Sequence, residues 1–201
     1  MNNVVLTKSF SQPEINRSEL LRYASVGEET TEIGGLLDEC IGEALPRLDY
    51  RVCYRAFRVS DCGDTTDLGF CKTESAVLKK YLSECEYIIL FAATVGVEID
   101  RLIKKYSHLS PAKATLLQAL GSERVESLCD EFSDEIKAAA EASGYTAKPR
   151  VSAGYGDIPL SMQRDIFLSL DCSRKIGVTL GESLLMTPEK SVTAIIGIKK
   201  K

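Results

Sequence analysis

Residues 86–94 constrain the fold more than any other part of the sequence, because they are almost continuously apolar. The apolar members of this run are Ile88, Ile89, Leu90, Phe91, Ala92 and Ala93. A short apolar run of this kind is typical of a strand that is covered on both faces. Gly96 ends the run before a helix that we expect over residues 98–106. We therefore predict that residues 86–94 form the centre of a sheet.

The longest helix is predicted to begin at Ser110-Pro111 and to end at Ser143-Gly144. Serine is a common cap, proline suits the first helical position, and glycine is common just after the last turn. An apolar stripe follows the helical period through Leu117, Leu120, Val125, Leu128, Phe132, Ile136 and Ala139. Gly121 within this helix costs about 1 kcal/mol relative to alanine. We expect it to mark a kink or a close approach by another backbone.

Several shorter helices are predicted from caps and apolar spacing. Asn16 and Glu19 form a capping pair at the start of the first, Pro46 stops the second, and Ser161 caps the last. In the last helix, Ile166, Phe167 and Leu170 are expected to face inward. The first helix is predicted over residues 16–23, the second from residue 30 or 31 to residue 45, and a third over residues 73–83.

Predicted strands complete the secondary structure. Residues 50–59 alternate apolar side chains with arginines, which predicts a strand with one face exposed to solvent. Further strands are predicted at residues 68–71 and 148–152. A terminal hairpin is expected from residues 182–186 and 191–198, turning at residues 187–190. Because strands and helices do not alternate regularly, the pattern favours an α+β fold. We predict a single domain over residues 1–201, with a largely antiparallel twisted sheet flanked by helices.

Charge and composition exclude several classes of function. The net charge is −4, without the basic footprint that nucleic-acid-binding proteins use against phosphates. An export signal and an apolar segment of membrane-spanning length are both absent, so we expect a cytoplasmic protein whose seven cysteines stay reduced. Cys53, Cys62 and Cys71 recur every nine residues, but zinc sites usually contain close cysteine or histidine pairs. Buried thiols are the favoured interpretation over a metal site.

Signatures of catalysis are weak. His108 is the only histidine in the sequence, so a serine or cysteine nucleophile has no obvious partner base. The glycines of residues 153–157 do not have the spacing of a dinucleotide fingerprint, and no Lys-Ser/Thr pair follows them as in a phosphate loop. We expect no turnover by this chain alone.

A different kind of site is suggested by the loop after residue 149. Gly154 and Gly156 allow the backbone to come close to a ligand, and Arg150 and Tyr155 frame them. Arginine grips a carboxylate with two parallel hydrogen bonds, and a tyrosine offers both a flat apolar ring and a hydroxyl. From composition and spacing alone, a surface turn with a locally paired Arg150 remains the more common explanation of such a loop.

Motifs in the second half of the chain resemble one family. Arg150-Val-Ser-Ala-Gly154-Tyr155, Ile176-Gly-Val-Thr-Leu180 and Pro188-Glu-Lys-Ser191-Val192 together resemble the activation domain of cobalamin-dependent methionine synthase. The resemblance is clearest over residues 85–201 and faint before them. Gly181 departs from the family, where a threonine is more usual.

The resemblance implies a binding site for S-adenosylmethionine. Arg150 would bind the methionyl carboxylate, the backbone around Ser152 and Ala153 would contact the ligand, and Tyr155 would lie against it. The similarity of residues 121–126 to the family points to Glu126 as the acid near the ligand's amino group. The implied binding residues are thus Glu126, Arg150, Ser152, Ala153, Gly154 and Tyr155. The aspartate that the family supplies from its N-terminal part stays open among Asp49, Asp61, Asp64 and Asp67.

The resemblance also implies a function. The chain would be a free-standing accessory protein that supports reductive methylation of oxidised cobalamin, with the cobalamin carried by a partner chain. That partner would be a methionine synthase lacking its own activation module, or a related methyltransferase, with a flavodoxin-like electron donor. One alternative is a small-molecule-binding or structural subunit with the same fold. Another, a methyltransferase acting on a different acceptor, is disfavoured because the common glycine-rich strand-to-helix loop is absent.

Overall fold

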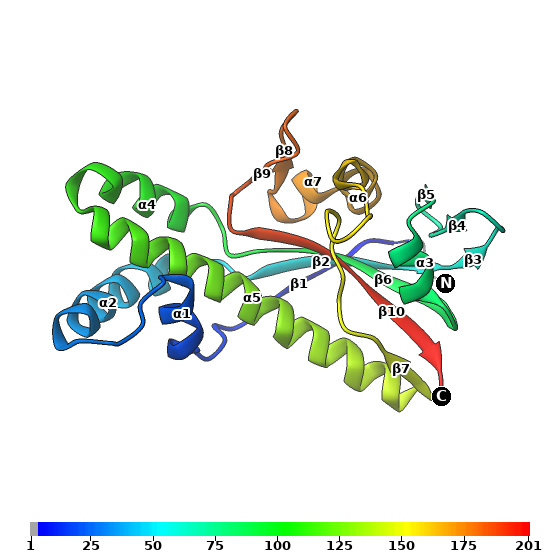
Figure 1. The fold of residues 1–201 in the computed structure, drawn as a ribbon, viewed down its shortest axis with the longest axis horizontal. Helices are drawn as coiled ribbons and strands as arrows, with labels where there is room; N and C mark the ends of the chain where they lie inside the picture. Colours follow the sequence, from blue (N-terminus) through cyan, green and yellow to red (C-terminus); the bar gives the residue numbers. More distant parts are fainter. Residues whose placement is uncertain (1–3) are drawn as a thin grey trace.

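Within residues 4–201, which the computed structural model describes, five strands form a twisted antiparallel sheet (Figure 1). Strand β6 (Cys85–Thr94) lies in the middle, paired with β2 (Arg51–Arg58) on one side and β10 (Ser191–Lys200) on the other. The strand order is β1 (Leu6–Ser9), β2 (Arg51–Arg58), β6 (Cys85–Thr94), β10 (Ser191–Lys200) and β7 (Tyr145–Ala147). The prediction of an α+β fold with residues 86–94 at the centre of the sheet is confirmed.

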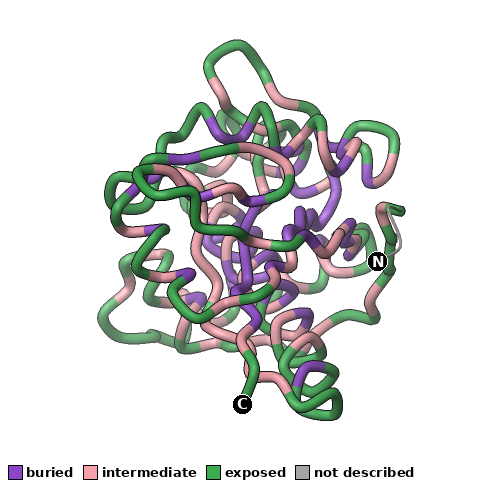
Figure 2. Tube along the Cα trace, turned by 90° about the vertical axis from the view of Figure 1, so that its right-hand side faces the viewer, coloured by how far each residue is buried: buried purple, intermediate pink, exposed green. Residues whose placement is uncertain are grey.

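The continuous apolar run of β6 exists because both faces of the sheet carry a hydrophobic core. Phe91 and Ala93 belong to one core cluster, whereas Leu90 and Ala92 belong to the other. Successive side chains of a strand point to opposite faces, so a strand between two cores needs apolar residues at every position. Figure 2 shows the buried residues concentrated in the interior of the molecule.

A helical layer covers the first face of the sheet. Helix α5 (Pro111–Ala142) runs along it, and its Phe132 ring packs against the rings of Phe91 and Tyr54, with centroids 4.8 and 5.1 Å away. Ser110 caps α5 by accepting a hydrogen bond from the Lys113 N–H, as the sequence predicts. The layer consists of α1 (Arg17–Tyr23), α2 (Thr31–Ala44), η1 (Leu45–Arg47), α4 (Glu98–Leu109) and α5 (Pro111–Ala142) (Figure 1).

The second face of the sheet is covered by shorter elements. Their apolar side chains, such as Leu78 and Ile166, pack against the inner residues of β2, β6 and β10. The helices are α3 (Ala76–Leu82), η2 (Leu160–Met162), α6 (Gln163–Leu170) and α7 (Cys172–Ile176). The strands are β3 (Ser60–Asp61), β4 (Thr66–Asp67), β5 (Lys72–Thr73), β8 (Thr179–Leu180) and β9 (Met186–Thr187).

The predicted terminal hairpin is wrong. Strand β9 pairs with β8, and β10 joins the main sheet between β6 and β7. The register places Ser191 opposite Thr94 and Ile195 opposite Leu90. Pairing with β6 lets the apolar residues of β10 contribute to both cores, which a hairpin on the surface would not allow.

Three local predictions also need correction. Residues 68–71 form the turn between β4 and β5 rather than a strand, with Gly69 at φ +77°. The strand expected at residues 148–152 lies earlier, at β7, and Val151 makes only an isolated bridge to Ile195. Ser161 lies inside η2, and α6 begins without a side-chain cap.

The close approach expected at Gly121 is made by side chains rather than by another backbone. A β-carbon there would lie 2.9 Å from Lys190 Cγ and 3.0 Å from Ile99 Cγ1. Helix α5 continues through this position without a break. Gly121 therefore makes room for Lys190, whose ammonium group donates to the Ser122 hydroxyl at 3.0 Å.

The start of α1 is tied to α5 by an unexpected contact. Asn16 caps α1 as predicted, with Oδ1 accepting from the Glu19 N–H at 3.1 Å. The Glu19 carboxylate, however, pairs with Arg22, and the Asn16 N–H donates to Glu123 Oε1 at 2.9 Å. The Glu123 carboxylate, 107 residues away in the chain, thus accepts the hydrogen bond from the Asn16 N–H that Glu19 was predicted to accept.

Glu123 belongs to a buried ion pair with its neighbour Arg124. Their residues are 1% and 0% exposed. Arg124 also donates to the carbonyl oxygens of Pro13 and Glu14 at 2.6 and 2.7 Å. These contacts pair the charges of Glu123 and Arg124 inside the protein and hold the segment before α1 against α5.

No helix in the described part of the chain is long and apolar enough to cross a membrane.

Candidate functional site

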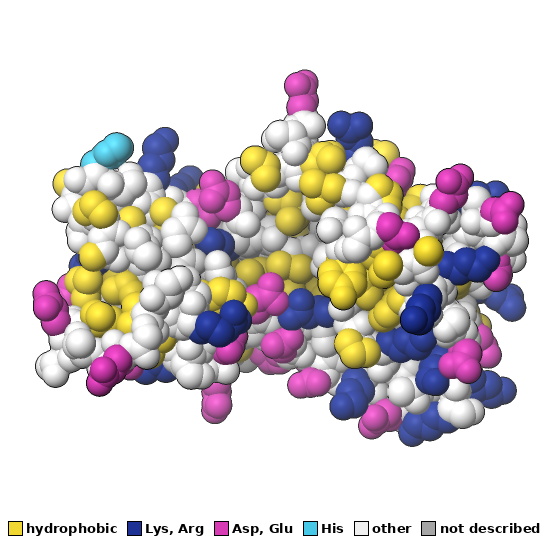
Figure 3. All heavy atoms as spheres, viewed as in Figure 1, with side chains coloured by type: hydrophobic (Ala, Val, Ile, Leu, Met, Phe, Trp, Pro, Cys, Tyr) yellow, Lys and Arg dark blue, Asp and Glu magenta, His cyan; other side chains and the backbone are white. Residues whose placement is uncertain are grey.

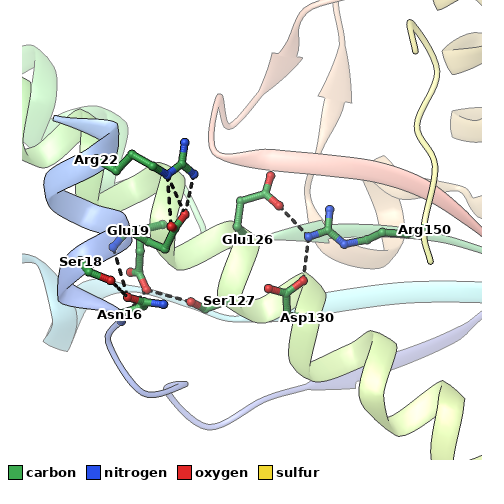
Figure 4. A network of polar contacts seen from close by, with 9 residues as sticks. Asn16, Ser18, Glu19, Arg22, Glu126, Ser127, Asp130 and Arg150 are labelled. Atoms are coloured by element: carbon green, nitrogen blue, oxygen red, sulfur yellow. Dashed lines mark hydrogen bonds and ion pairs between the residues drawn. The ribbon is translucent and has the colours of Figure 1, made fainter. Parts of the chain in front are cut away.

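Arg150 is held by two carboxylates of α5. Its Nη2 atom donates to Glu126 Oε2 at 2.7 Å and to Asp130 Oδ1 at 2.8 Å. Figure 4 shows Glu126 and Asp130 on successive turns of the helix, both directed toward Arg150. The structure therefore brings together two residues that the sequence analysis proposed separately. It adds Asp130, which the sequence analysis missed although its spacing of four residues from Glu126 places both on one helix face.

The surroundings of Arg150 keep it charged. Burial alone would lower the pKa of the guanidinium, but the hydrogen bonds to Asp130 and Glu126 outweigh it, and the pKa is raised. Cys129, between the two acids in sequence, lies in the core, and burial raises the pKa of its thiol. The ionic group at this place thus consists of Arg150, Glu126 and Asp130.

A cavity of about 470 Å³ opens beside Arg150. Small-molecule sites are commonly about 300–1,000 Å³ in volume. Tyr155 forms part of the wall and is 67% exposed, so it can contact a ligand without moving out of a packed core. The lining residues are Tyr81, Lys148, Pro149, Arg150, Val151, Ser152 and Tyr155.

Tyr81 of α3 fixes the segment that carries Arg150, a role that no local signal in the sequence indicates. Its hydroxyl donates to the Pro149 carbonyl at 2.6 Å and accepts from the Gly197 N–H of β10 at 2.9 Å. Burial raises the pKa of Tyr81 to about 12, so the hydroxyl remains a donor. A β-carbon at Gly197 would lie 2.9 Å from Cys85 Sγ and 3.3 Å from the Tyr81 ring, so glycine is what lets Tyr81 reach this position.

The glycine loop after Arg150 has a defined conformation. Gly154 and Gly156 adopt φ values of +91° and +59°, which favour glycine. The Gly154 N–H donates to the Ile158 carbonyl at 2.9 Å, and the Ile158 N–H donates to the Tyr155 carbonyl at 3.0 Å. These bonds close the loop on itself and set the direction of Tyr155.

Asp157 joins this loop to α3. Its carboxylate accepts hydrogen bonds from the Ser75 hydroxyl and from the backbone N–H groups of Ala76 and Val77, the latter two at 2.7 and 3.2 Å. A β-carbon at Gly156 would lie only 3.1 Å from Val77 Cγ2, so the backbone of the loop packs closely against the Val77 side chain. The start of α3 therefore anchors the loop that carries Tyr155.

Replacing Asp157 by asparagine is expected to reduce stability in a pH-dependent way. The Ser75 hydroxyl, followed by the two backbone N–H groups, holds the pKa of Asp157 below its ordinary 3.8. A depressed pKa stabilises the folded state above the unfolded-state pKa, and this stabilisation is lost as the pH falls through the folded-state value. The difference in unfolding free energy between wild type and Asp157→Asn should therefore be present at about pH 7, begin to shrink below about pH 3.8, and be lost once the pH falls below the folded-state pKa.

Urea unfolding over this pH range checks the prediction. Asp64→Asn, which removes the same charge from the exposed turn between β3 and β4, is the matched control. A difference for Asp157→Asn that stays constant down to the most acidic pH would contradict the assigned contacts.

The remaining implied residues lie along the same loop. Ser152 lines the cavity, whereas Ala153 packs against the second core cluster and Gly154 is exposed. Of the aspartates left open, Asp49 pairs with Arg51 at 2.9 Å and Asp61 pairs with Lys79 at 3.3 Å. Neither these two nor Asp64 or Asp67 is among the described residues that line the cavity.

The three regularly spaced cysteines lie in different environments. Cys53 is buried, Cys71 is half-buried and Cys62 is exposed. Among residues 4–201, the structure contains no group of three or more histidine, cysteine or acidic side chains arranged to hold a metal ion.

Charged and apolar side chains are distributed unevenly over the surface. Figure 3 shows apolar atoms gathered over the middle of one face, with lysines and arginines collected on its lower right side near the C-terminus. Of the ionic group, Arg150 lines the cavity, whereas Asp130 lines a separate surface depression formed with residues 12–17.

Comparisons with known proteins agree with this architecture. Residues 71–201 match the family described as "Vitamin B12 dependent methionine synthase, activation domain". Among solved structures, the chain is similar to one described as "Crystal Structure of the MetH Reactivation Domain bound to AdoHcy", with a TM-score of 0.73 and 17% sequence identity. The match covers 96% of this chain and 78% of that chain. Among curated proteins, none matches the chain significantly.

Proposed function

Because the chain belongs to the family of vitamin B12-dependent methionine synthase activation domains, we propose that it binds S-adenosylmethionine beside Arg150 and presents it to a cobalamin enzyme. The observation that carries this proposal is the Arg150–Glu126 pair, at 2.7 Å, beside a cavity of about 470 Å³. The similar solved domain binds AdoHcy, which is S-adenosylmethionine without its transferable methyl group.

The residues around the cavity suit the parts of this ligand. Arg150 is proposed to bind the methionyl carboxylate, because a guanidinium can donate two parallel hydrogen bonds to it. Glu126 is proposed to bind the amino group, and the exposed ring of Tyr155 to lie against the apolar surface of the ligand. The backbone from Ser152 to Gly154 supplies further polar groups beside the same cavity.

The contribution of the chain to the reaction is positioning. Cobalamin carried by the partner would supply the cobalt chemistry that takes up the methyl group of S-adenosylmethionine, and S-adenosylhomocysteine would be left in the cavity. The cavity would hold the methyl sulfonium in one orientation, which converts a two-body encounter into a local one. The clamp of Tyr81 on the Pro149 carbonyl supports this role, because it keeps the Arg150 segment in place before a ligand arrives.

The partners follow from the same proposal. The cobalamin would be carried by a methionine synthase chain that lacks its own activation module, or by a related cobalamin methyltransferase. A flavodoxin-like protein would supply the electron that returns oxidised cobalt to its reactive state. The chain itself would act as an accessory protein.

A reconstitution experiment tests this function. We expect a cobalamin methionine synthase without its activation module, held in the oxidised cobalamin state with reduced flavodoxin, to regain activity when both this chain and S-adenosylmethionine are added. The appearance of methylcobalamin is followed by absorbance, with S-adenosylhomocysteine in place of S-adenosylmethionine as the control. Binding of S-adenosylmethionine without any reactivation would instead favour a small-molecule-binding subunit with no role in methyl transfer.

A further inference from the structure

In the ionic group of Arg150, Glu126 and Asp130, the proposed function assigns a ligand contact to Arg150 and to Glu126 but none to Asp130. Its Oδ1 atom lies 2.8 Å from Arg150 Nη2, one helical turn beyond Glu126 (Figure 4). We propose that Asp130 selects the cationic sulfonium ligand over its neutral thioether product, an inference that rests on the proposed binding of S-adenosylmethionine at this site.

The hydrogen bonds of Arg150 require an exchange when a ligand carboxylate binds. Glu126 and Asp130 both accept from the same nitrogen, Nη2. A carboxylate that binds two nitrogens at the tip of a guanidinium also needs Nη2, so it takes the place of one of the two acids. The side chain of Asp130 is 70% exposed and that of Glu126 37%, so Asp130 is the acid that is free to move. Ligand binding therefore frees the Asp130 carboxylate next to Arg150, at the edge of the cavity that Arg150 lines.

The charges of the site and the ligand then complement each other. Arg150, Glu126 and Asp130 together carry one net negative formal charge. S-adenosylmethionine carries one net positive charge, whereas S-adenosylhomocysteine, which lacks the sulfonium, is neutral. Once the ligand carboxylate pairs with Arg150 and the ammonium pairs with Glu126, the sulfonium and Asp130 remain as opposite charges.

Lys148 also lines the cavity, but its ammonium group is engaged elsewhere. Its Nζ atom donates to the carbonyl oxygens of Tyr81 and Ser83, at 2.5 and 3.0 Å. Carbonyls at the C-terminal end of a helix carry partial negative charge, so they offset the lysine charge.

Transfer of the methyl group would convert the cationic sulfonium of the ligand into a neutral thioether. This change would remove the attraction between the ligand and Asp130 and favour release of the product.

Calorimetric titration of both ligands into three proteins tests the inference. For Asp130→Asn at low ionic strength, we expect the Kd of S-adenosylmethionine to rise by about three- to tenfold, because an exposed charge acts through a high dielectric. The Kd of S-adenosylhomocysteine should change by less than about twofold. The matched control is Asp134→Asn, one turn further along α5 and exposed, which should alter neither ligand's Kd.

The possible outcomes separate the inference from the proposed function. If the wild-type chain binds neither ligand, the proposed function fails and the inference falls with it. If wild type binds S-adenosylmethionine but Asp130→Asn changes both ligands equally, or changes neither, the inference alone is overturned. A thermal unfolding midpoint for Asp130→Asn within about 2 °C of wild type establishes that the variant is folded, because loss of one exposed ion pair costs little stability.

Discussion

Replacing Arg150 by alanine should weaken the binding of S-adenosylmethionine by about 2–5 kcal/mol, which corresponds to a rise in Kd of roughly 30- to 4,000-fold. The substitution removes the donor proposed for the ligand carboxylate. It also leaves Glu126 and Asp130, on successive turns of α5, without the charge that now holds them together. The ligand carboxylate would then approach two acids with no compensating cation.

Calorimetric titration measures the effect directly. Arg150→Lys should bind with intermediate affinity, because lysine keeps the charge but cannot donate in the fork geometry of a guanidinium. Arg101→Ala is the matched control, since Arg101 forms an exposed ion pair with Glu98 within α4 and lies outside the cavity lining. Unchanged affinity in Arg150→Ala would show that the ligand does not bind through Arg150.

Replacing Glu123 by alanine is expected to lower the free energy of unfolding by about 3–5 kcal/mol, the range found when one partner of a buried ion pair is removed. The change would leave the guanidinium of Arg124, which is 0% exposed, without its carboxylate. It would also remove the acceptor of the Asn16 N–H at the start of α1. Urea unfolding measures the loss.

Two control variants test whether the loss of stability arises because the ion pair is buried. Glu135→Ala breaks the ion pair of Glu135 with Lys8, in which both side chains are 43% exposed, and should cost less than about 1 kcal/mol. The double variant Glu123→Leu with Arg124→Met removes both buried charges and should be more stable than Glu123→Ala. A loss for Glu123→Ala no larger than that for Glu135→Ala would argue against a buried pair.

The two largest predicted effects concern one helix. Glu123 and Arg124 anchor the segment before α1 to α5, and Glu126 and Asp130 follow on the same helix beside Arg150. The buried pair therefore contributes to the position of the acids that form the site. A helix held by buried charges is a rigid support for a binding group.

Local sequence signals predicted the elements that depend on nearby residues. The cap at Ser110 and the long apolar stripe define α5, and the apolar run of β6 requires cover on both faces. These features are set by the helical and strand periods, which act over a few residues. The prediction of a terminal hairpin was wrong because the pairing of β10 depends on a strand that is distant in the sequence. The partner of β10 is β6, about 100 residues earlier, and nothing in the hairpin sequence identifies it.

The residues of the candidate site also fall into two groups: those that are neighbours in the sequence and those that folding brings together. The sequence by itself determined that Arg150, the glycines of the loop and Tyr155 are close together, because they are neighbours in the chain, and the resemblance pointed to Glu126. Tertiary structure decided that Asp130 shares Arg150 with Glu126, that Tyr81 clamps the Pro149 carbonyl, and that Glu123 replaces Glu19 at the Asn16 N–H. Each of these contacts joins residues 20 or more positions apart. The packing of α5 and α3 on the sheet brings such residues together, and for the buried Glu123 burial also requires that its carboxylate be paired.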